Sequence, residues 1–192
     1  MEDRLRPHFP ELIETARLII RPPHPDDGAE VNAAIRETFA DLHRWMNWAS
    51  YLPSVAETEQ RRQHAYEAWL AGKDFNVQAH LKTTGVLAVC AGLHPLDWNV
   101  PKFEIGYWCR ARYQGYGYVT ETVRALTQVG FETFAAKRIE IRCDERNIRS
   151  RQVAERAGYS LEAILKHDQI APDGSIRNTL IFAMLPEQYH GL

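Results

Sequence analysis

Residues 112–120 read Arg112-Tyr113-Gln114-Gly115-Tyr116-Gly117-Tyr118-Val119-Thr120, and the predicted fold depends on this stretch. An apolar run over 103–109 predicts a strand before it, and helical spacing over 119–134 predicts a helix after it. Two glycines and an arginine therefore stand where a strand passes into a helix. Free N–H groups at a helix start attract anions, glycines let a ligand approach the backbone, and arginine suits phosphate oxygens. The pattern predicts a site for the diphosphate of a nucleotide-like cofactor, and hence an enzyme.

The composition excludes several classes of protein. With 192 residues, of which 45% are apolar and 25% charged, the chain is expected to form a single domain over 1–192, with 1–14 as a loosely held lead-in. A formal net charge of −2 argues against a general nucleic-acid or membrane-surface binder. No apolar run approaches the roughly 20 residues of a membrane span, and the charged N-terminus does not resemble a signal peptide.

The cysteine pattern indicates a reducing environment. Cys90, Cys109 and Cys143 are too few and too far apart for a disulfide framework. No CxxC pair and no repeated ligand spacing predicts a metal site. We therefore expect a cytoplasmic protein that binds no metal.

Apolar patterning predicts a mixed α/β chain with an antiparallel front half. The predicted helices begin at 25–27 and span 54–72, 119–134 and 148–157. Residues 42–53 are rich in aromatic side chains without a period, so we expect a loop or short helix that walls a substrate cleft, caps the core or forms a homodimer face. The predicted strands are 18–20, 75–81, 86–93, 103–109, 139–143, 159–165 and 179–185.

Two common nucleotide motifs are missing, and a third pattern fits. The chain contains neither GxxxxGK[ST] nor an early GxGxxG. Its Arg112-x-x-Gly115-x-Gly117 resembles the acetyl-CoA motif Arg/Gln-x-x-Gly-x-Gly/Ala of the GNAT superfamily of acyltransferases. The segment 15–21 and the pattern Asn147-x-x-Ser150 up to 158–159 also match. Over roughly 12–186 the chain resembles the RimJ/RimL-type branch of this superfamily, whose best-known members acetylate protein N-termini.

The resemblance implies an α/β (α+β) GNAT fold. It has a single mixed, mostly antiparallel sheet of six to seven strands with about four helices. Two central strands, here 103–109 and 139–143, splay into a V and leave backbone groups that the pantetheine arm of coenzyme A pairs with. Backbone contacts to this arm are expected from Tyr107, Trp108 and Cys109, whose side chains could simply pack in the core.

The resemblance also assigns the diphosphate to the turn. Its oxygens would accept hydrogen bonds from the N–H groups of Gln114, Gly115, Tyr116, Gly117 and Tyr118. The Arg112 side chain would assist them. The competing interpretations are a plain tight turn for the glycines and a surface ion pair for the arginine.

Candidate catalytic residues follow from the chemistry of amide formation. An amino terminus has a pKa near 8, so a modest base suffices, and Glu104 is the candidate, acting directly or through water. The alternative is a charged residue on the solvent face of its strand. The amide N–H of Trp108 or Cys109 would stabilise the developing oxyanion.

A proton donor for the leaving thiolate is less obvious. Many relatives carry a tyrosine about seven residues after the asparagine, but this chain has Ala154 there. In the RimL-like pattern Ser150 serves instead, with support of the first helical turn as its competing role. Asn147 is expected to bond the pantetheine arm, to cap the helix, or both. Asn178 stands where many relatives have an aspartate.

The predicted function is an acetyl-CoA-dependent N-acetyltransferase that acts by direct attack of a primary amine on the thioester. A protein or peptide N-terminus, such as that of a ribosomal protein, is the first expectation for the acceptor. A small-molecule amine (polyamine, amino acid analogue or antibiotic) and a non-catalytic acyl-CoA-binding module are the alternatives.

Overall fold

The computed structural model describes residues 7–191. Their helices are α1 (Gly28–Trp45), α2 (Val55–Leu70), α3 (Tyr118–Gln128), which a π-helical turn (Val129–Thr133) continues, and α4 (Ile148–Arg156). Their strands are β1 (Ile13–Glu14), β2 (Leu18–Arg21), β3 (Phe75–Leu81), β4 (Leu87–Asp97), β5 (Lys102–Cys109), β6 (Arg138–Asp144), β7 (Ser160–Ile170) and β8 (Ile176–Met184).

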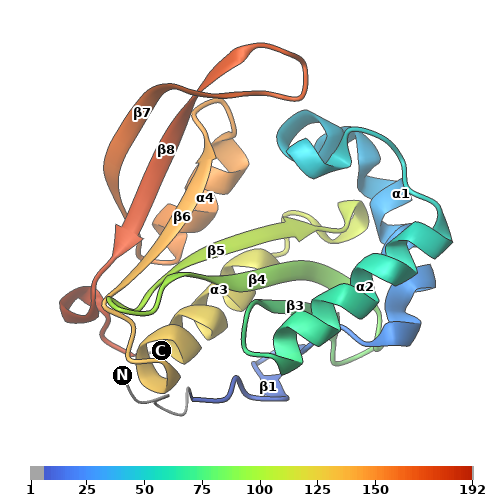
Figure 1. Cartoon of the computed structure of the whole chain (residues 1–192), viewed down its shortest axis with the longest axis horizontal. Coiled ribbons are helices and arrows are strands. Elements are labelled where there is room, and N and C mark those ends of the chain that lie inside the picture. The colour runs from blue at the N-terminus through green and yellow to red at the C-terminus, as the bar shows by residue number, and fades with distance from the viewer. Residues whose placement is uncertain (1–6, 192) are drawn as a thin grey trace.

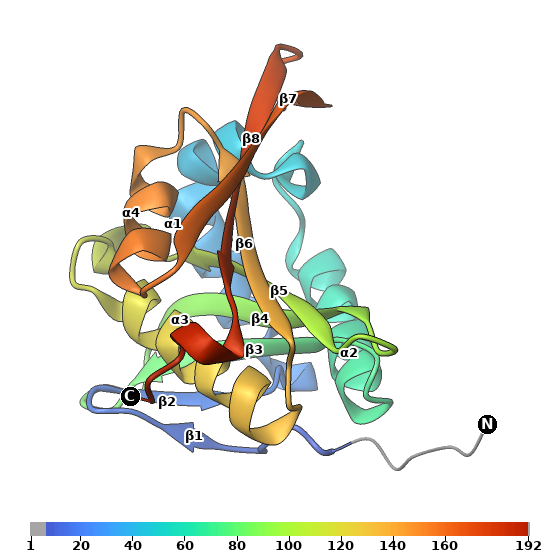
Figure 2. The same cartoon turned by 90° about the vertical axis from the view of Figure 1, so that its left-hand side faces the viewer.

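All eight strands form a single sheet in the order β1-β2-β3-β4-β5-β6-β8-β7 (Figure 1). Neighbouring strands are antiparallel except β5 and β6, which are parallel. Helices α3 and α4 cover one face and α1 and α2 the other (Figure 2). The predicted mixed, mostly antiparallel sheet with about four helices is confirmed.

The number of strands differs from the predicted six to seven because β1 falls within the predicted lead-in. In the described part of that segment, Ile13 and Glu14 pair with Ile20 and Ile19 of β2. Phe9 is 4% exposed and stacks on Phe75 at 5.2 Å between ring centroids. Phe9, Ile13 and Glu14 of the predicted lead-in are therefore in contact with the core and the sheet, and residues 1–6 lie outside the described part.

The predicted V between the two central strands is confirmed. Strands β5 and β6 are paired over only three residues, from Lys102–Arg138 to Glu104–Glu140. Beyond Glu104 they diverge, as the green and orange strands in Figure 1 show. Residues 105–109 stay paired with β4 on their other side. This half of β5 therefore has no strand partner along the edge that faces β6.

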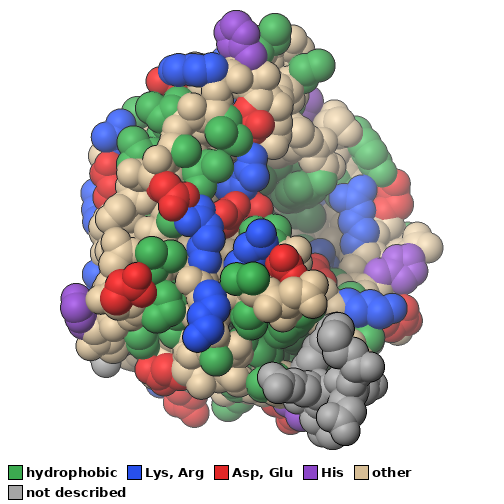
Figure 3. Space-filling view, turned by 60° about the vertical axis from the view of Figure 1, so that its left-hand side comes forward, with side chains coloured by type: hydrophobic (Ala, Val, Ile, Leu, Met, Phe, Trp, Pro, Cys, Tyr) green, Lys and Arg blue, Asp and Glu red, His purple; other side chains and the backbone are tan. Residues whose placement is uncertain are grey.

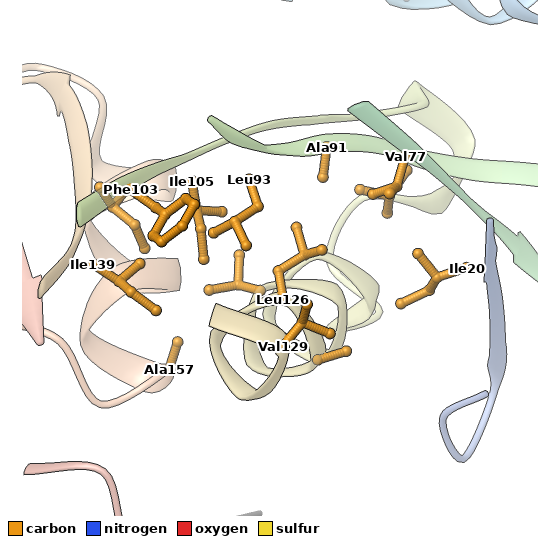
Figure 4. Close-up of a cluster of buried hydrophobic side chains, with 14 of the residues drawn as sticks. Ile20, Val77, Ala91, Leu93, Phe103, Ile105, Leu126, Val129, Ile139 and Ala157 are labelled. Carbon is orange, nitrogen blue, oxygen red and sulfur yellow. The ribbon is translucent and has the colours of Figure 1, made fainter. Parts of the chain in front are cut away.

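Figure 4 shows the larger core, which lies between the sheet and α3. Phe103, Leu126 and Ile139 meet there and are fully buried. Burial of each such side chain stabilises the fold by about 1.5–3 kcal/mol. A smaller core around Ile35 and Leu87 joins α1 to the opposite face. The two cores pack against the middle strands from both sides and so hold the end of β5 in position.

Helix ends explain how the aromatic segment 42–53 is placed. Helix α1 continues to Trp45, because Leu42 is still buried against the smaller core, and ends where Met46 is extended. A short 3-10 turn over 47–49 follows, and α2 starts at a capping box in which Ser54 and Glu57 bond each other's backbone N–H groups. The segment is therefore part helix and part turn. None of the helices in residues 7–191 is long and apolar enough to span a membrane.

Candidate active site

The glycine turn opens α3 in a conformation that requires glycine. Gly115 has φ of 83° and Gly117, the N-cap of α3, has φ of 82°. Both values lie in the left-handed region that other residues rarely adopt. No atom of another segment lies within 4 Å of where a Cβ of Gly115 would be. The turn thus presents its backbone to open space at the start of a helix.

A cleft of about 1280 Å³ runs from this turn along the splayed edge of β5. Its walls include Gln114, both glycines of the turn and Tyr118 on one side, and Asn147 and Ser150 on the other. It is also lined by Tyr107, Trp108 and Cys109, and by four arginines, Arg17, Arg124, Arg149 and Arg156. Three carboxylates, Glu14, Asp41 and Glu121, line it as well, and Arg17 pairs with Glu121 and Arg149 with Asp41. The lining of the cleft therefore carries only a small excess of positive charge.

Arg112 and Tyr116 are the two expected cofactor residues that do not line this cleft. The Arg112 guanidinium lies 2.6 Å from the Glu37 carboxylate, and its backbone N–H donates to the same group at 2.9 Å. Hydrogen bonding from Arg112 lowers the pKa of Glu37 to about 2. Tyr116 is 62% exposed and stacks on Tyr118. In this structure Arg112 holds the turn against α1, as in the competing interpretation of an ion pair.

Arg17 is a cation at the turn that the sequence interpretation did not single out. Its guanidinium lies 2.6 Å from the Glu121 carboxylate and 4.6 Å from the centre of the Tyr118 ring, and it donates to the carbonyl oxygen of Tyr116 at 2.9 Å. The pairing ties the loop between β1 and β2 to the start of α3. The matching segment 15–21 was the available signal for it.

Ser150 and Asn147 stand at the start of α4, across the V from β5. The Ser150 N–H donates to Asn147 Oδ1 at 3.1 Å, so Asn147 caps the helix. The Tyr107 hydroxyl donates to the Ser150 carbonyl oxygen at 3.1 Å and lies 3.0 Å from Ser150 Oγ. Burial raises the pKa of Tyr107 well above its ordinary value, so this phenol stays protonated. A hydroxyl pair therefore links β5 to the start of α4 beside the V.

A second cleft of about 980 Å³ opens on the face of the sheet covered by α1 and α2. It shares Tyr107, Trp108, Asn147 and Ser150 with the first cleft, so the two meet at the V. Four residues of the aromatic segment, Trp45, Met46, Asn47 and Trp48, line it, and Trp45 and Met46 line the first cleft as well. Tyr51 lies outside its lining and donates to Glu57. Figure 3 shows a face of the molecule that is hollowed right of centre, with Lys and Arg side chains beside the hollow.

Glu104 lies in this second cleft opposite His94 in the β4–β5 register. Burial raises the pKa of Glu104, partly offset by the nearby Arg142 and His94. A group with a raised pKa is better suited to accept a proton near neutral pH than an exposed glutamate. Glu104 is thus a half-buried carboxyl beside the V rather than a fully exposed residue on the solvent face.

His94 is held against the sheet by a carboxylate and two glycines. Its Nδ1 lies 2.5 Å from Asp74 Oδ1. The ring occupies the space above Gly92 and Gly106, which face each other in the register, and a Cβ on Gly92 would come within 2.4 Å of it. Burial alone would lower the pKa of His94, but the hydrogen bond and charge of Asp74, with Glu104, raise it. The sequence alone predicts His94 near the acceptor side, with a structural role as the more common one for an isolated histidine, and its partner Asp74 depends on how the strands pair.

Two further side chains are poor candidates for a role in catalysis: the Cys109 thiol is unreactive, and Asn178 lies outside the lining of both clefts. Burial raises the pKa of the Cys109 thiol to about 12, so it is a poor nucleophile at neutral pH. Asn178 bonds the Glu145 side chain and the His167 backbone N–H, and therefore supports the β7–β8 hairpin. Within residues 7–191 no group of three or more His, Cys, Asp or Glu side chains is placed to hold a metal ion.

Comparisons with known proteins agree with this geometry. The model of the acetyltransferase (GNAT) domain matches residues 17–160. The Bacillus subtilis (strain 168) protein named "Putative ribosomal N-acetyltransferase YdaF" is 30% identical over 182 residues, which are 91% of this chain and 94% of that protein. The ribosomal-protein-serine acetyltransferase of Escherichia coli is 28% identical over 134 residues, 69% of this chain and 73% of that protein.

Among solved structures, that of RimL, an alpha-N-acetyltransferase of a ribosomal protein, in complex with coenzyme A, superposes with a TM-score of 0.85. It is 20% identical, and the superposition covers 93% of this chain and all of RimL, so this likeness concerns the fold. The resemblance inferred from the glycine turn and Asn147-x-x-Ser150 is confirmed by the family match. This chain belongs to the GNAT family of acetyltransferases.

Proposed function

We propose that this enzyme transfers an acetyl group from acetyl-CoA to the amino terminus of a protein or peptide. The observation that carries the proposal is that two clefts approach the V from opposite sides and share Tyr107, Trp108, Asn147 and Ser150. One cleft would hold the donor and the other the acceptor. A ribosomal protein is the candidate acceptor suggested by the names of the relatives, and its acetylation would take place in the cytoplasm.

The first cleft has the chemistry that a coenzyme A molecule needs. The left-handed turn at Gly115 and Gly117 leaves open space beside the backbone at Gly115, which suits a diphosphate. The expected contact from the Gln114 N–H is not available in this structure, because that group donates to the Ala111 carbonyl oxygen at 3.2 Å. The unpartnered edge of β5 over 105–109 suits the amide groups of a pantetheine arm. Arg124 and Arg156 add positive charge to the same cleft, whereas Arg17 and Arg149 are paired with Glu121 and Asp41 in its lining. Arg112, which ion-pairs with Glu37, would act by fixing the turn.

The second cleft supplies the groups that amide formation requires. Glu104 would accept the proton of the incoming ammonium, directly or through water, since its raised pKa brings it closer to neutral pH. The amide N–H of Trp108 or Cys109 on the splayed edge would stabilise the oxyanion that develops on the acetyl carbonyl. Ser150, bonded to the Tyr107 hydroxyl, would donate a proton to the leaving thiolate. The high pKa of Cys109 favours direct transfer over an acyl-cysteine.

An acceptor panel tests the proposal. The enzyme is incubated with acetyl-CoA and either N-terminal peptides, a polyamine, free amino acids or an aminoglycoside, and free thiol is followed together with the mass of the acceptor. We expect thiol release and an acetylated N-terminus with peptides, and none with N-terminally blocked peptides. Turnover with small amines but with no peptide would overturn the assignment of the acceptor.

Two substitutions test the assignment of the chemistry. Glu104→Gln and Ser150→Ala should each slow turnover, by about 10²–10⁴-fold for the base, without changing the affinity for coenzyme A. Ser160→Ala, an exposed serine on β7, is the matched control and should leave both unchanged. Coenzyme A binding with no turnover on any amine would instead favour a non-catalytic acyl-CoA-binding module.

A further inference from the structure

The side chains that line the second cleft carry more positive than negative charge. Four arginines line it, Arg61 and Arg62 from α2, Arg142 from β6 and Arg177 from β8, together with two carboxylates. One of the carboxylates, Asp144, is already paired with an arginine outside the lining, at 2.8 Å. The other is Glu104, next to the V. The walls of the cleft are thus basic away from the point where the acetyl group would be transferred.

Three of these arginines have no acidic partner. Arg142 lies 3.3 Å from Asp168, whereas none of the ion pairs formed within residues 7–191 includes Arg61, Arg62 or Arg177. A guanidinium that is withdrawn from water without an anion is costly, and its retention in a cleft indicates a partner that arrives from outside.

Unsatisfied polar atoms mark the same place. The Nε atoms of Arg62 and Arg177 are buried without a hydrogen-bond partner, whereas Arg177 Nη1 and Nη2 donate to the Trp45 carbonyl oxygen and to the Gln169 side chain. Thr179 lines the same cleft and is only 3% exposed, and its hydroxyl also has no hydrogen-bond partner. Arg177 and Thr179 are two residues apart on β8, so they share one face of the strand. Buried polar groups are nearly always paired, so this group is incomplete without a ligand.

The geometry points to an acceptor that carries an anionic oxygen group, a carboxylate or a phosphate, close to its reactive amine. Arg62 and Arg177, with the Thr179 hydroxyl, would bind this group while the amine reaches Glu104 and the V. Arginine and a hydroxyl together form the charge-assisted hydrogen bonds that such oxygens accept. Resting on the proposed function, this inference names the substrate class as a peptide with an acidic residue near its N-terminus.

Matched acceptors test the inference. One set consists of serine-starting peptides that carry Asp or Asn at the second, third or fourth position, and a second pair is phosphoethanolamine and ethanolamine. For each, kcat/KM is measured from free thiol. We expect the acidic peptide to be favoured over its amide twin by about ten- to one-hundredfold at the best position, and the preference to shrink at high salt.

Variants connect the preference to the residues. Arg62→Gln and Arg177→Gln should each reduce the preference by about tenfold while the rate with the neutral peptide, which also reports correct folding, stays within about twofold of wild type. Arg151→Gln is the matched control, because it removes one positive charge from the outside of α4, where Arg151 pairs with Glu155. It should leave the preference unchanged.

The outcomes separate this inference from the proposed function. Acetylation of peptides with no preference for the acidic twin would overturn the inference and leave the proposed function standing. A preference for phosphoethanolamine with no peptide acetylated would support an anionic acceptor and overturn the peptide assignment. A preference that survives in both arginine variants would show that other residues bind the anion, and so would overturn the inference as stated.

Discussion

Replacing Gly115 by alanine tests the claim that the turn needs a left-handed glycine and binds a diphosphate. Gly85, in the turn between β3 and β4, is the matched control. It has φ of 69° where Gly115 has 83°, and no atom of another segment lies within 4 Å of a Cβ at either position. Alanine therefore costs backbone strain and no clash at both sites. Only Gly115 lines a cleft.

The expected magnitude follows from the backbone. Left-handed strain of about 1–2 kcal/mol, less about 0.4–1 kcal/mol from the stiffer unfolded chain, leaves a loss of roughly 1 kcal/mol for either variant. For a chain of this length the Tm should fall by about 2–4 °C. The new methyl of Gly115→Ala also stands where phosphate oxygens must approach the N–H groups, so the Kd for coenzyme A should rise about tenfold or more.

Denaturant unfolding and calorimetric titration with coenzyme A measure the two effects separately. Gly85→Ala should lose stability and bind coenzyme A as the wild type does. If Gly85→Ala were as stable as the wild type, the strain argument would fail. If Gly115→Ala bound coenzyme A within twofold of the wild type, the diphosphate would not lie on this turn.

Three further predictions concern the groups around the V. Tyr107→Phe should lower kcat about five- to tenfold with an unchanged KM for acetyl-CoA. Tyr159→Phe is the control, because the Tyr159 hydroxyl lies 2.6 Å from Thr127 Oγ1 in the core and its loss should lower stability alone. Equal kcat in the two variants would contradict the role of the Tyr107–Ser150 hydroxyl pair. Burial raises the pKa of Glu104 in the folded state, so its contribution to stability is lost as pH rises from the ordinary glutamate value. Glu104→Gln should then melt higher than the wild type at neutral pH and equally in acid, and a constant difference across pH in thermal melts would refute this. Asp74→Asn should lower the pKa of His94 in an NMR titration, because burial then outweighs the remaining interactions, and an unchanged pKa would disprove the pairing.

Local sequence was enough to predict the turn and the strand and helix on either side of it, and the family resemblance supplied the V. The glycines, the preceding apolar strand and the capping asparagine lie within short segments whose conformations follow from backbone preferences. The family pattern then related the segments to one another. For this reason Glu104, Asn147 and Ser150 were placed on the correct elements before their distances were known.

Side-chain partners far apart in the chain could not be predicted in this way. Arg112 was expected to face a phosphate, but it bonds Glu37, 75 residues away. Arg17 meets Glu121 across 104 residues. Such pairs depend on how α1 and β2 pack against the turn. The sequence alone does not show which oppositely charged side chain will lie nearest to a given charged residue.

Because two different clefts meet at the V, substitutions in one cleft and in the other are expected to have different consequences for the enzyme. On the donor side, the contacts proposed for the diphosphate and the pantetheine arm come mainly from the main chain of the glycine turn and β5, which most substitutions leave intact. In the second cleft, where we propose that the acceptor binds, the walls include side chains of α2 and β8, such as Arg62 and Arg177. Point mutations there can exchange one acceptor for another while the enzyme keeps its donor. The choice of acceptor can therefore change among related enzymes while each intermediate variant still uses acetyl-CoA as its donor.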